Sequence, residues 1–343
     1  DATKPFVLRR LIRYSIPVAS LAKRIDMAWK GDGTWYNVLV QNFTDANRKK
    51  IFRYREIAEA SEKVAEAAGY KSMSDAHARL SGTYGKKYQE MVTVEIGGKK
   101  RRIPKGAAMD LWAHATDAST SELLANGQTI NFRRNKMADD QTVNVASVYH
   151  ALTPQERAFV EQMKAVKDTM FAEMDATNRR LKGTSLDRQP GHWSRTRNSK
   201  MSEKIGQTDV YRNTSDFHLD NSGFLKQRTG GRVPIIIGDF LEGWHRQTNA
   251  MMQFTYLSEP VRWAEQLALH PDVKPTIVSL YGEQMIRRIE RGITDASGTS
   301  PFVDLSWLQS SIRTITARVG RALTSVNWRS WAKNLGGVLK IMG

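Results

Sequence analysis

The chain has 343 residues, 40% of them hydrophobic, so it is long enough to bury one large core or two smaller ones. It contains no cysteine, which excludes disulfides, thiolate metal sites and cysteine nucleophiles. A formal net charge of +17, from 52 basic and 35 acidic residues, favours polyanionic partners such as nucleic acid, anionic lipid or an acidic protein.

The first predicted element is a basic amphipathic helix over residues 5–29. Pro17 is expected to kink or split this helix, and Gly31-Asp32-Gly33 to end it. Such a helix either lies on a membrane surface or packs against a neighbouring helix. The chain begins at Asp1, with no initiator Met and no secretory signal, so we expect it to be a piece of a longer protein.

A second helix is predicted from a cap at Thr44-Asp45 to Ala68, and Gly69 is expected to end it. It is rich in Ala, Glu and Lys. Its two basic triplets, residues 48–50 and 53–55, are most simply a solvated face.

A short helix over residues 74–80 precedes a predicted β-hairpin near residues 91–103. Residues 91–96 alternate between apolar and polar, Gly97-Gly98 permits a tight turn, and residues 99–103 read Lys-Lys-Arg-Arg-Ile. A basic hairpin either enters a nucleic-acid groove or is an edge protected by its charges, and the sequence leaves both open.

The next helix is predicted over residues 106–125, ending at Asn126-Gly127. A looser segment spans residues 128–141, and a short helix is expected over residues 143–151.

The best-defined element is a long helix from Thr153 through Leu181. Thr153 is the predicted N-cap, Pro154 occupies the first helical position, and Glu156 stands where a capping-box carboxylate belongs. Apolar side chains then recur at heptad-like steps, which predicts a packing seam rather than a ligand site. Its members are Phe159, Met163, Val166, Met170 and Met174.

A long basic segment without helical periodicity comes next, near residues 183–237. From Asn178 to Arg232 there are twelve basic residues against five acidic ones, with aromatic residues between them. This composition is typical of a groove that tracks a nucleic-acid backbone, and also of a loop that its aromatics pin to the helices. The candidate nucleic-acid-binding residues are Arg179, Arg180, Lys182, Arg188, Trp193, Arg195, Arg197, Lys226, Arg228 and Arg232.

Residues 233–237 predict a short buried strand or extended entry, and Asp239 is expected to start a helix. Pro260 should kink or end that helix, and another is predicted over residues 259–269. A further helix is expected over residues 276–291.

The C-terminal part begins with a predicted linker over residues 292–300 and continues with helices over residues 303–323 and 326–339. Residues 305–343 contain no acid, and tryptophans stand among the cations, which favours contact with a membrane surface or with a partner subunit. The candidate interface residues are Trp307, Arg318, Arg321, Trp328, Arg329, Trp331 and Lys333. No apolar run reaches the ~18 residues of an ordinary transmembrane helix.

Catalytic motifs are missing from the sequence: it has no P-loop, no dinucleotide fingerprint, no zincin motif and no nucleophile elbow. The seven histidines are scattered and form no i, i+4 pair. We therefore predict no catalytic, cofactor or metal residue, no bound cofactor and no enzymatic activity.

One resemblance joins the long helix to the segments on its C-terminal side. After the helix comes the aromatic–basic box Gly191-His192-Trp193-Ser194-Arg195, then the segment FLKQR…VPIII…DFLEGWHRQTNAMMQF over residues 224–254. Leu-Ala-Leu-His-Pro-Asp-Val stands at residues 267–273, and Tyr281-Gly282 opens a helix. The order resembles the large polyvalent-protein-associated helical domains of phage and mobile-element proteins. These include internal virion proteins, also called ejection proteins.

The resemblance implies a structural segment of a bacteriophage ejection protein that forms or lines a conduit for genome delivery. It implies non-sequence-specific contact with viral double-stranded DNA, and contact with other virion or ejection proteins, the portal or the tail. It also implies contact with the bacterial inner membrane and homo-oligomerisation. The location would be the virion interior, then the host envelope (periplasm and inner membrane). Two alternatives stay open: an accessory region of a virion-packaged nucleic-acid enzyme such as a virion RNA polymerase, and a basic scaffold that binds only other proteins.

The expected fold is mainly α, an elongated multi-helix architecture with one small hairpin near residues 91–103. Three regions are predicted. They are an N-terminal helical region with the hairpin (1–140), the long helix with the basic segment and following helices (141–292), and the basic C-terminal helices (293–343).

Overall fold

A computed structural model describes residues 18–28, 31–81, 89–117, 120–121, 124, 130–131, 142–186, 193 and 235–297. Most of these residues are helical, which confirms the predicted mainly α fold with one small antiparallel hairpin. Residues 5–17 of the helix predicted over residues 5–29, and the predicted C-terminal helices, lie outside the described residues. So do their candidate interface residues Trp307, Arg318, Arg321, Trp328, Arg329, Trp331 and Lys333.

The N-terminal helices join into a longer run than the sequence predicts. Helix α2 (Val18–Ala28) comes first, and α3 (Thr34–Tyr36), η1 (Asn37–Gln41) and α4 (Asn42–Ala67) form one run without a break between them. The cap predicted at Thr44-Asp45 is therefore wrong. The run begins at Thr34 because the carboxylate of Asp26 accepts hydrogen bonds from the backbone N–H groups of Trp35 and Tyr36, both at 2.9 Å. Its end at Gly69 is as predicted.

The predicted hairpin is present. Strands β1 (Met91–Ile96) and β2 (Lys99–Pro104) pair antiparallel after the short helix α5 (Met73–Ser81). Gly97 and Gly98 have φ of 61° and 70°, the positive values that a two-residue type I′ turn needs at both positions. The other edge of β1 is also occupied, because Ile96 bridges Val143. Strand β2 is therefore the outer strand.

Helix α6 (Lys105–Ala115) ends earlier than the predicted residue 125. The chain leaves the helix at Thr116, whose hydroxyl donates to Glu161 and accepts from Lys164 Nζ, both at 2.8 Å. These partners lie 45 and 48 residues further along the chain, so the sequence around residue 116 does not predict them. Helix α8 (Val145–Ala151) forms as predicted, capped by Asn144.

The predicted long helix is interrupted. Helix α9 (Pro154–Asp168) has the predicted capping box between Thr153 and Glu156, but it ends before α10 (Phe171–Lys182). At the break, Arg53 Nη2 donates to both the carbonyl and the hydroxyl of Thr169, at 3.1 Å each. Arg53 was predicted to lie on a solvated face, and that prediction is wrong. The apolar seam is buried packing as predicted, with Phe159, Met163, Met170 and Met174 all buried and Val166 partly buried.

The helix that Asp239 starts is the longest single α-helix described. Helix α12 (Phe240–Ala268) runs through Pro260, so the predicted end there and the separate helix over residues 259–269 are both wrong. Packing against α4, α10 and α14 outweighs the one backbone hydrogen bond that a proline removes. The extended entry before it is confirmed, because β4 (Ile235–Ile236) pairs in parallel with β3 (Ile130–Asn131).

The helix predicted over residues 276–291 divides in two. Helices α13 (Lys274–Tyr281) and α14 (Glu283–Ser297) meet at Gly282, whose φ of 83° strongly favours glycine. Helix α14 extends to Ser297, so the linker predicted over residues 292–300 begins inside a helix.

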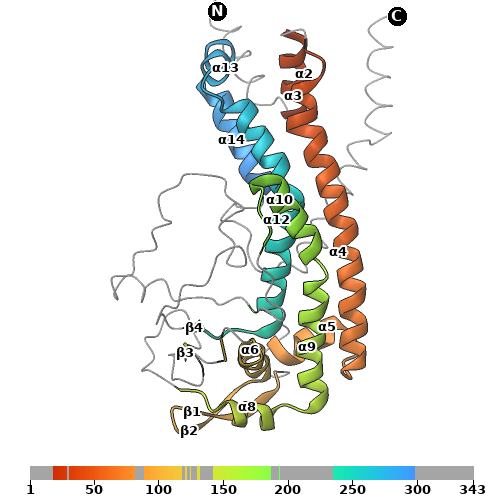
Figure 1. Ribbon diagram of the computed structural model, residues 1–343, viewed down its shortest axis with the longest axis vertical. Coiled ribbons are helices and arrows are strands. Elements are labelled where there is room, and N and C mark those ends of the chain that lie inside the picture. Colours follow the sequence, from red (N-terminus) through yellow and green to blue (C-terminus); the bar gives the residue numbers. More distant parts are fainter. Residues whose placement is uncertain are drawn as a thin grey trace, which may run out of the picture. The chain divides into compact units, whose positions relative to one another are not determined.

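Helix α12 is the element around which the described helices pack. It contacts α4, α9 and α10, and also α5, α6 and α14; Figure 1 shows α4 and the α9–α10 pair running alongside it. Elements from both sides of residue 140 thus share one core.

Gly106, at the start of α6, lies very close to Asp239, the N-cap residue of α12. A Cβ atom there would lie 2.0 Å from Asp239 Oδ2 and 3.1 Å from the Leu80 carbonyl. Because Asp239 caps α12, moving its carboxylate weakens that cap. We expect Gly106→Ala to lower the free energy of unfolding by about 2–3 kcal/mol, measured by urea denaturation. Gly238→Ala, whose Cβ would meet nothing within 4 Å, is the matched control. Equal effects of the two substitutions would contradict the expectation.

Candidate functional site

Strand β2 carries the densest exposed charge in the described part of the chain. Lys99, Lys100, Arg101 and Arg102 are consecutive and all exposed. Within the described residues none of them has an ion pair. Because strand side chains alternate, Lys99 and Arg101 lie on one face and Lys100 and Arg102 on the other, ~6.6 Å apart on each face.

The hairpin that carries these cations is anchored to the rest of the fold by buried side chains. Val94 and Ile96 on β1 and Ile103 on β2 are buried, and the hairpin packs against α6 and α8. Glu95 is the acid opposite Lys100, but its Oε2 accepts from Asn144 Nδ2 at 3.0 Å. The four cations are thus available to an external anion. The sequence marked this hairpin as basic, yet its residues were not among the predicted site residues.

The described cations that the sequence predicted to bind nucleic acid lie in the last turn of α10. Arg179 forms an ion pair with Asp175 at 2.8 Å, and Arg180 pairs with Glu259. Lys182 is exposed. Arg179 and Arg180 are therefore partly neutralised by the carboxylates of Asp175 and Glu259. The other predicted cations, Arg188, Arg195, Arg197, Lys226, Arg228 and Arg232, lie outside the described residues.

Trp193 is a core residue and not an exposed stacking surface. It is 1% exposed, and its ring stacks on Phe240 with 5.0 Å between centroids. Its indole N–H donates to Asp110 Oδ1 at 2.8 Å, and its backbone N–H to Asp117 Oδ2 at 2.7 Å. The prediction that Trp193 binds nucleic acid is therefore wrong, because its ring has no free face for a base.

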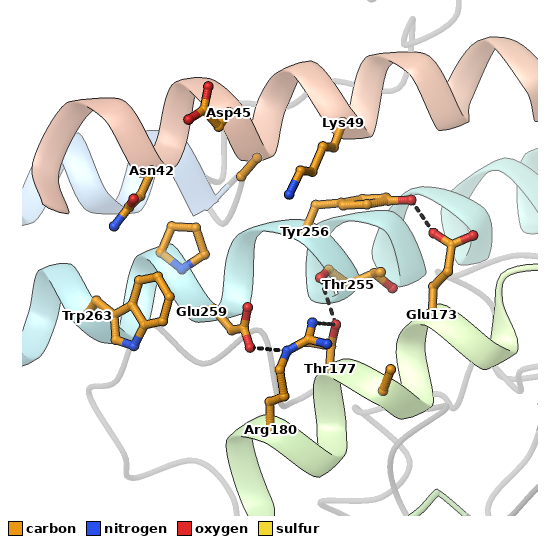
Figure 2. A pocket seen from close by; sticks show the side chains of 13 residues that line it. Asn42, Asp45, Lys49, Glu173, Thr177, Arg180, Thr255, Tyr256, Glu259 and Trp263 are labelled. Carbon is orange, nitrogen blue, oxygen red and sulfur yellow. Dashed lines mark hydrogen bonds and ion pairs between the residues drawn. The ribbon is translucent and has the colours of Figure 1, made fainter. Parts of the chain in front are cut away.

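A groove lies between α4, α10 and α12, with a volume of about 450 Å³. Figure 2 shows Asn42 and Trp263 at one end of it, and Lys49 and Tyr256 at the other. Arg180 lines the groove between them, held by Glu259 and Thr177. The groove therefore includes one residue of the predicted nucleic-acid set, with side chains that the sequence did not connect.

Two histidines meet inside the fold. Nε2 of His77 on α5 and Nε2 of His245 on α12 are 2.7 Å apart, and their rings stack. Burial lowers the pKa of His77 to about 4 and that of His245 to about 3, the latter also through repulsion by His77. Both rings are therefore neutral at pH 7, and one Nε2–H donates to the other nitrogen. The sequence did not predict this pair because its members are 168 residues apart.

The histidine pair adjoins a buried carboxylate. Ser81 Oγ lies 3.4 Å from His77 Nδ1 and donates to Asp239 Oδ1 at 3.0 Å. Burial raises the pKa of Asp239 to about 6, with a further contribution from the Asp110 carboxylate. Within the described ranges, no three His, Cys, Asp or Glu side chains are placed to hold a metal ion.

No protein-family model, curated protein or solved structure matches the chain. Among the helices described, none combines the length and the apolar character that crossing a membrane requires.

Proposed function

We propose that the chain is a structural segment of a bacteriophage ejection protein that binds double-stranded DNA without sequence preference. The observation that carries the DNA-binding part is the set of four exposed β2 cations that no carboxylate of the described residues neutralises. The net charge of +17 and the helical framework support it. The order of motifs in residues 140–340, which resembles ejection-protein domains, supports the phage context.

Phosphate contact is the chemistry that such a hairpin can provide. Lys and Arg on a strand reach phosphate oxygens, and these contacts position a duplex without reading its bases. Each contact releases condensed counterions, so binding weakens as salt rises. A protein that guides a genome needs this property, because every sequence must pass along it equally well.

We expect the double substitution Lys100→Gln/Arg102→Gln to reduce the slope of log affinity against log salt by about 2. The measurement is fluorescence anisotropy with a labelled duplex at several salt concentrations. The matched control is Arg55→Gln/Lys63→Gln, which removes two exposed cations of α4 that have no ion pair in the described structure. An identical slope change in the control would show that only net charge matters. A duplex affinity that does not depend on salt would overturn the DNA-binding proposal.

The delivery role has its own test. A conduit requires homo-oligomerisation and attachment to the inner membrane, together with contacts to the portal, the tail or other ejection proteins. We expect ring-shaped oligomers of the chain on anionic vesicles by electron microscopy. A stable monomer with affinity for neither DNA nor vesicles would leave only the protein-binding scaffold. Nucleotide incorporation or nuclease activity with a divalent metal would instead favour the accessory region of a nucleic-acid enzyme.

A further inference from the structure

We propose that the groove between α4, α10 and α12 binds a nucleotide, with its phosphates on Lys49 and its base on Trp263. The groove volume of about 450 Å³ lies in the range of small-ligand sites. Each helix lines it over about two turns: residues 42–49 of α4, 173–180 of α10 and 255–263 of α12. Seven residues of helix span ~10 Å.

Lys49 is a cation of the groove that forms no ion pair with the described residues. Each lining carboxylate already has a cation: Asp45 pairs with Arg48 at 3.6 Å, Glu173 with Arg53 at 3.0 Å, and Glu259 with Arg180. The Glu173 carboxylate also accepts from the Tyr256 hydroxyl. Lys49 has no ion pair within the described chain, and Figure 2 shows its ammonium directed into the groove. Arg53, the cation of Glu173, also pairs with Glu56 at 2.7 Å. Lys49 is therefore a lining cation that no described carboxylate neutralises, and it can bind an anion.

Trp263 gives the groove its second recognition element. Its side chain is 46% exposed, although it lines the groove beside the buried Pro260. An exposed indole at the rim of a cavity offers a flat face on which a base can stack. Between these ends, the hydroxyl of the buried Thr255 has no hydrogen-bond partner in the described structure.

The separation of the two recognition elements favours a particular ligand length. Figure 2 shows Lys49 and Trp263 near opposite ends of the groove. A base joined through its sugar to two or three phosphates spans such a site, whereas inorganic phosphate fills only one end. A free nucleoside triphosphate and the 5′-phosphorylated end of a single strand share this chemistry.

The test is calorimetric titration of the full chain with ATP in the absence of divalent metal. We expect Lys49→Ala and Trp263→Ala each to weaken binding about tenfold or more. Lys63→Ala, an exposed cation of α4 outside the groove, should change it less than twofold. Adenosine and inorganic triphosphate, which each carry half of the ligand, should each bind at least tenfold more weakly than ATP. Thermal unfolding of the variants checks that all of them fold.

The outcomes separate the ligand sources and the two proposals. Tighter binding of a 5′-phosphorylated oligonucleotide than of ATP assigns the site to strand ends, and the reverse order assigns it to free nucleotide. The hairpin variant Lys100→Gln/Arg102→Gln should keep wild-type affinity for ATP, so a failure of hairpin binding to DNA does not affect this test. Absence of binding by both ligands at millimolar concentration overturns the proposal. So does wild-type affinity in both groove variants.

Discussion

Trp193→Ala is expected to lower the free energy of unfolding by about 3–5 kcal/mol. The indole is almost fully buried and stacks on Phe240. Its removal leaves a cavity and takes the N–H donor away from the carboxylate of Asp110. Since domains are stable by only about 5–15 kcal/mol, this single change should move the urea midpoint strongly.

Trp193→Phe separates the two components of that loss. Phenylalanine keeps most of the stacking on Phe240 but cannot donate a hydrogen bond to Asp110 Oδ1. The other oxygen of that carboxylate, Oδ2, still accepts from the Gly238 N–H at 2.9 Å. We expect this variant to lose about 1–3 kcal/mol. The backbone bond to Asp117 survives in both variants. An alanine variant with wild-type stability and reduced affinity for single-stranded DNA would instead restore a stacking role for Trp193.

Acidification from pH 7 to pH 5 is expected to destabilise the protein through the His77–His245 pair. In the unfolded chain both histidines have a pKa near 6.5, whereas burial lowers the folded pKa of His77 to about 4 and of His245 to about 3. Their contribution to stability is therefore complete above pH 6.5 and is lost as the pH falls toward 4 and then 3. At 2.7 Å, a protonated pair would also place two like charges together.

Asp239 acts in the opposite direction. Its folded pKa is raised to about 6, so protonation favours the folded state as the pH falls from 6 toward 3.8. Two histidines outweigh one carboxylate, and the net loss at pH 5 should be on the order of 2–3 kcal/mol. Urea unfolding of the wild type at both pH values measures it.

The variants His77→Gln and Asp239→Asn identify the groups responsible. Glutamine removes one titrating ring at a partly exposed position, so the difference between pH 7 and pH 5 should shrink. Asparagine removes the opposing carboxylate, so the difference should grow. A loss on acidification that is the same in the wild type and in both variants would attribute it to other groups.

The sequence predicted best where one short segment contains all the partners. The capping box of Thr153 and Glu156 and the turn at Gly97-Gly98 formed as expected, because their partners are at most a few residues away. The buried seam of α9 and α10 was predicted from its spacing alone. The predicted helix end at Pro260 was wrong, because the rule for proline takes no account of the helices that pack against α12.

The candidate sites divide in a similar way. The run Lys99–Arg102 is basic by its composition, but its freedom from ion pairs depends on Glu95 bonding to Asn144. The composition around Trp193 is typical of a segment that binds nucleic acid. Trp193 is nevertheless buried, and it donates hydrogen bonds to two carboxylates about 80 residues away in the sequence.

The sequence by itself determined the helical class, the hairpin, the capping box of Thr153 and Glu156, and the strongly basic charge. Only the tertiary structure decided that α9 ends at Asp168, that His77 meets His245, and that α4, α10 and α12 enclose a groove. The physical reason is the range of the interactions. Periodicity and capping act within a few residues, whereas burial, ion pairing and the resulting pKa changes arise between residues far apart in the chain.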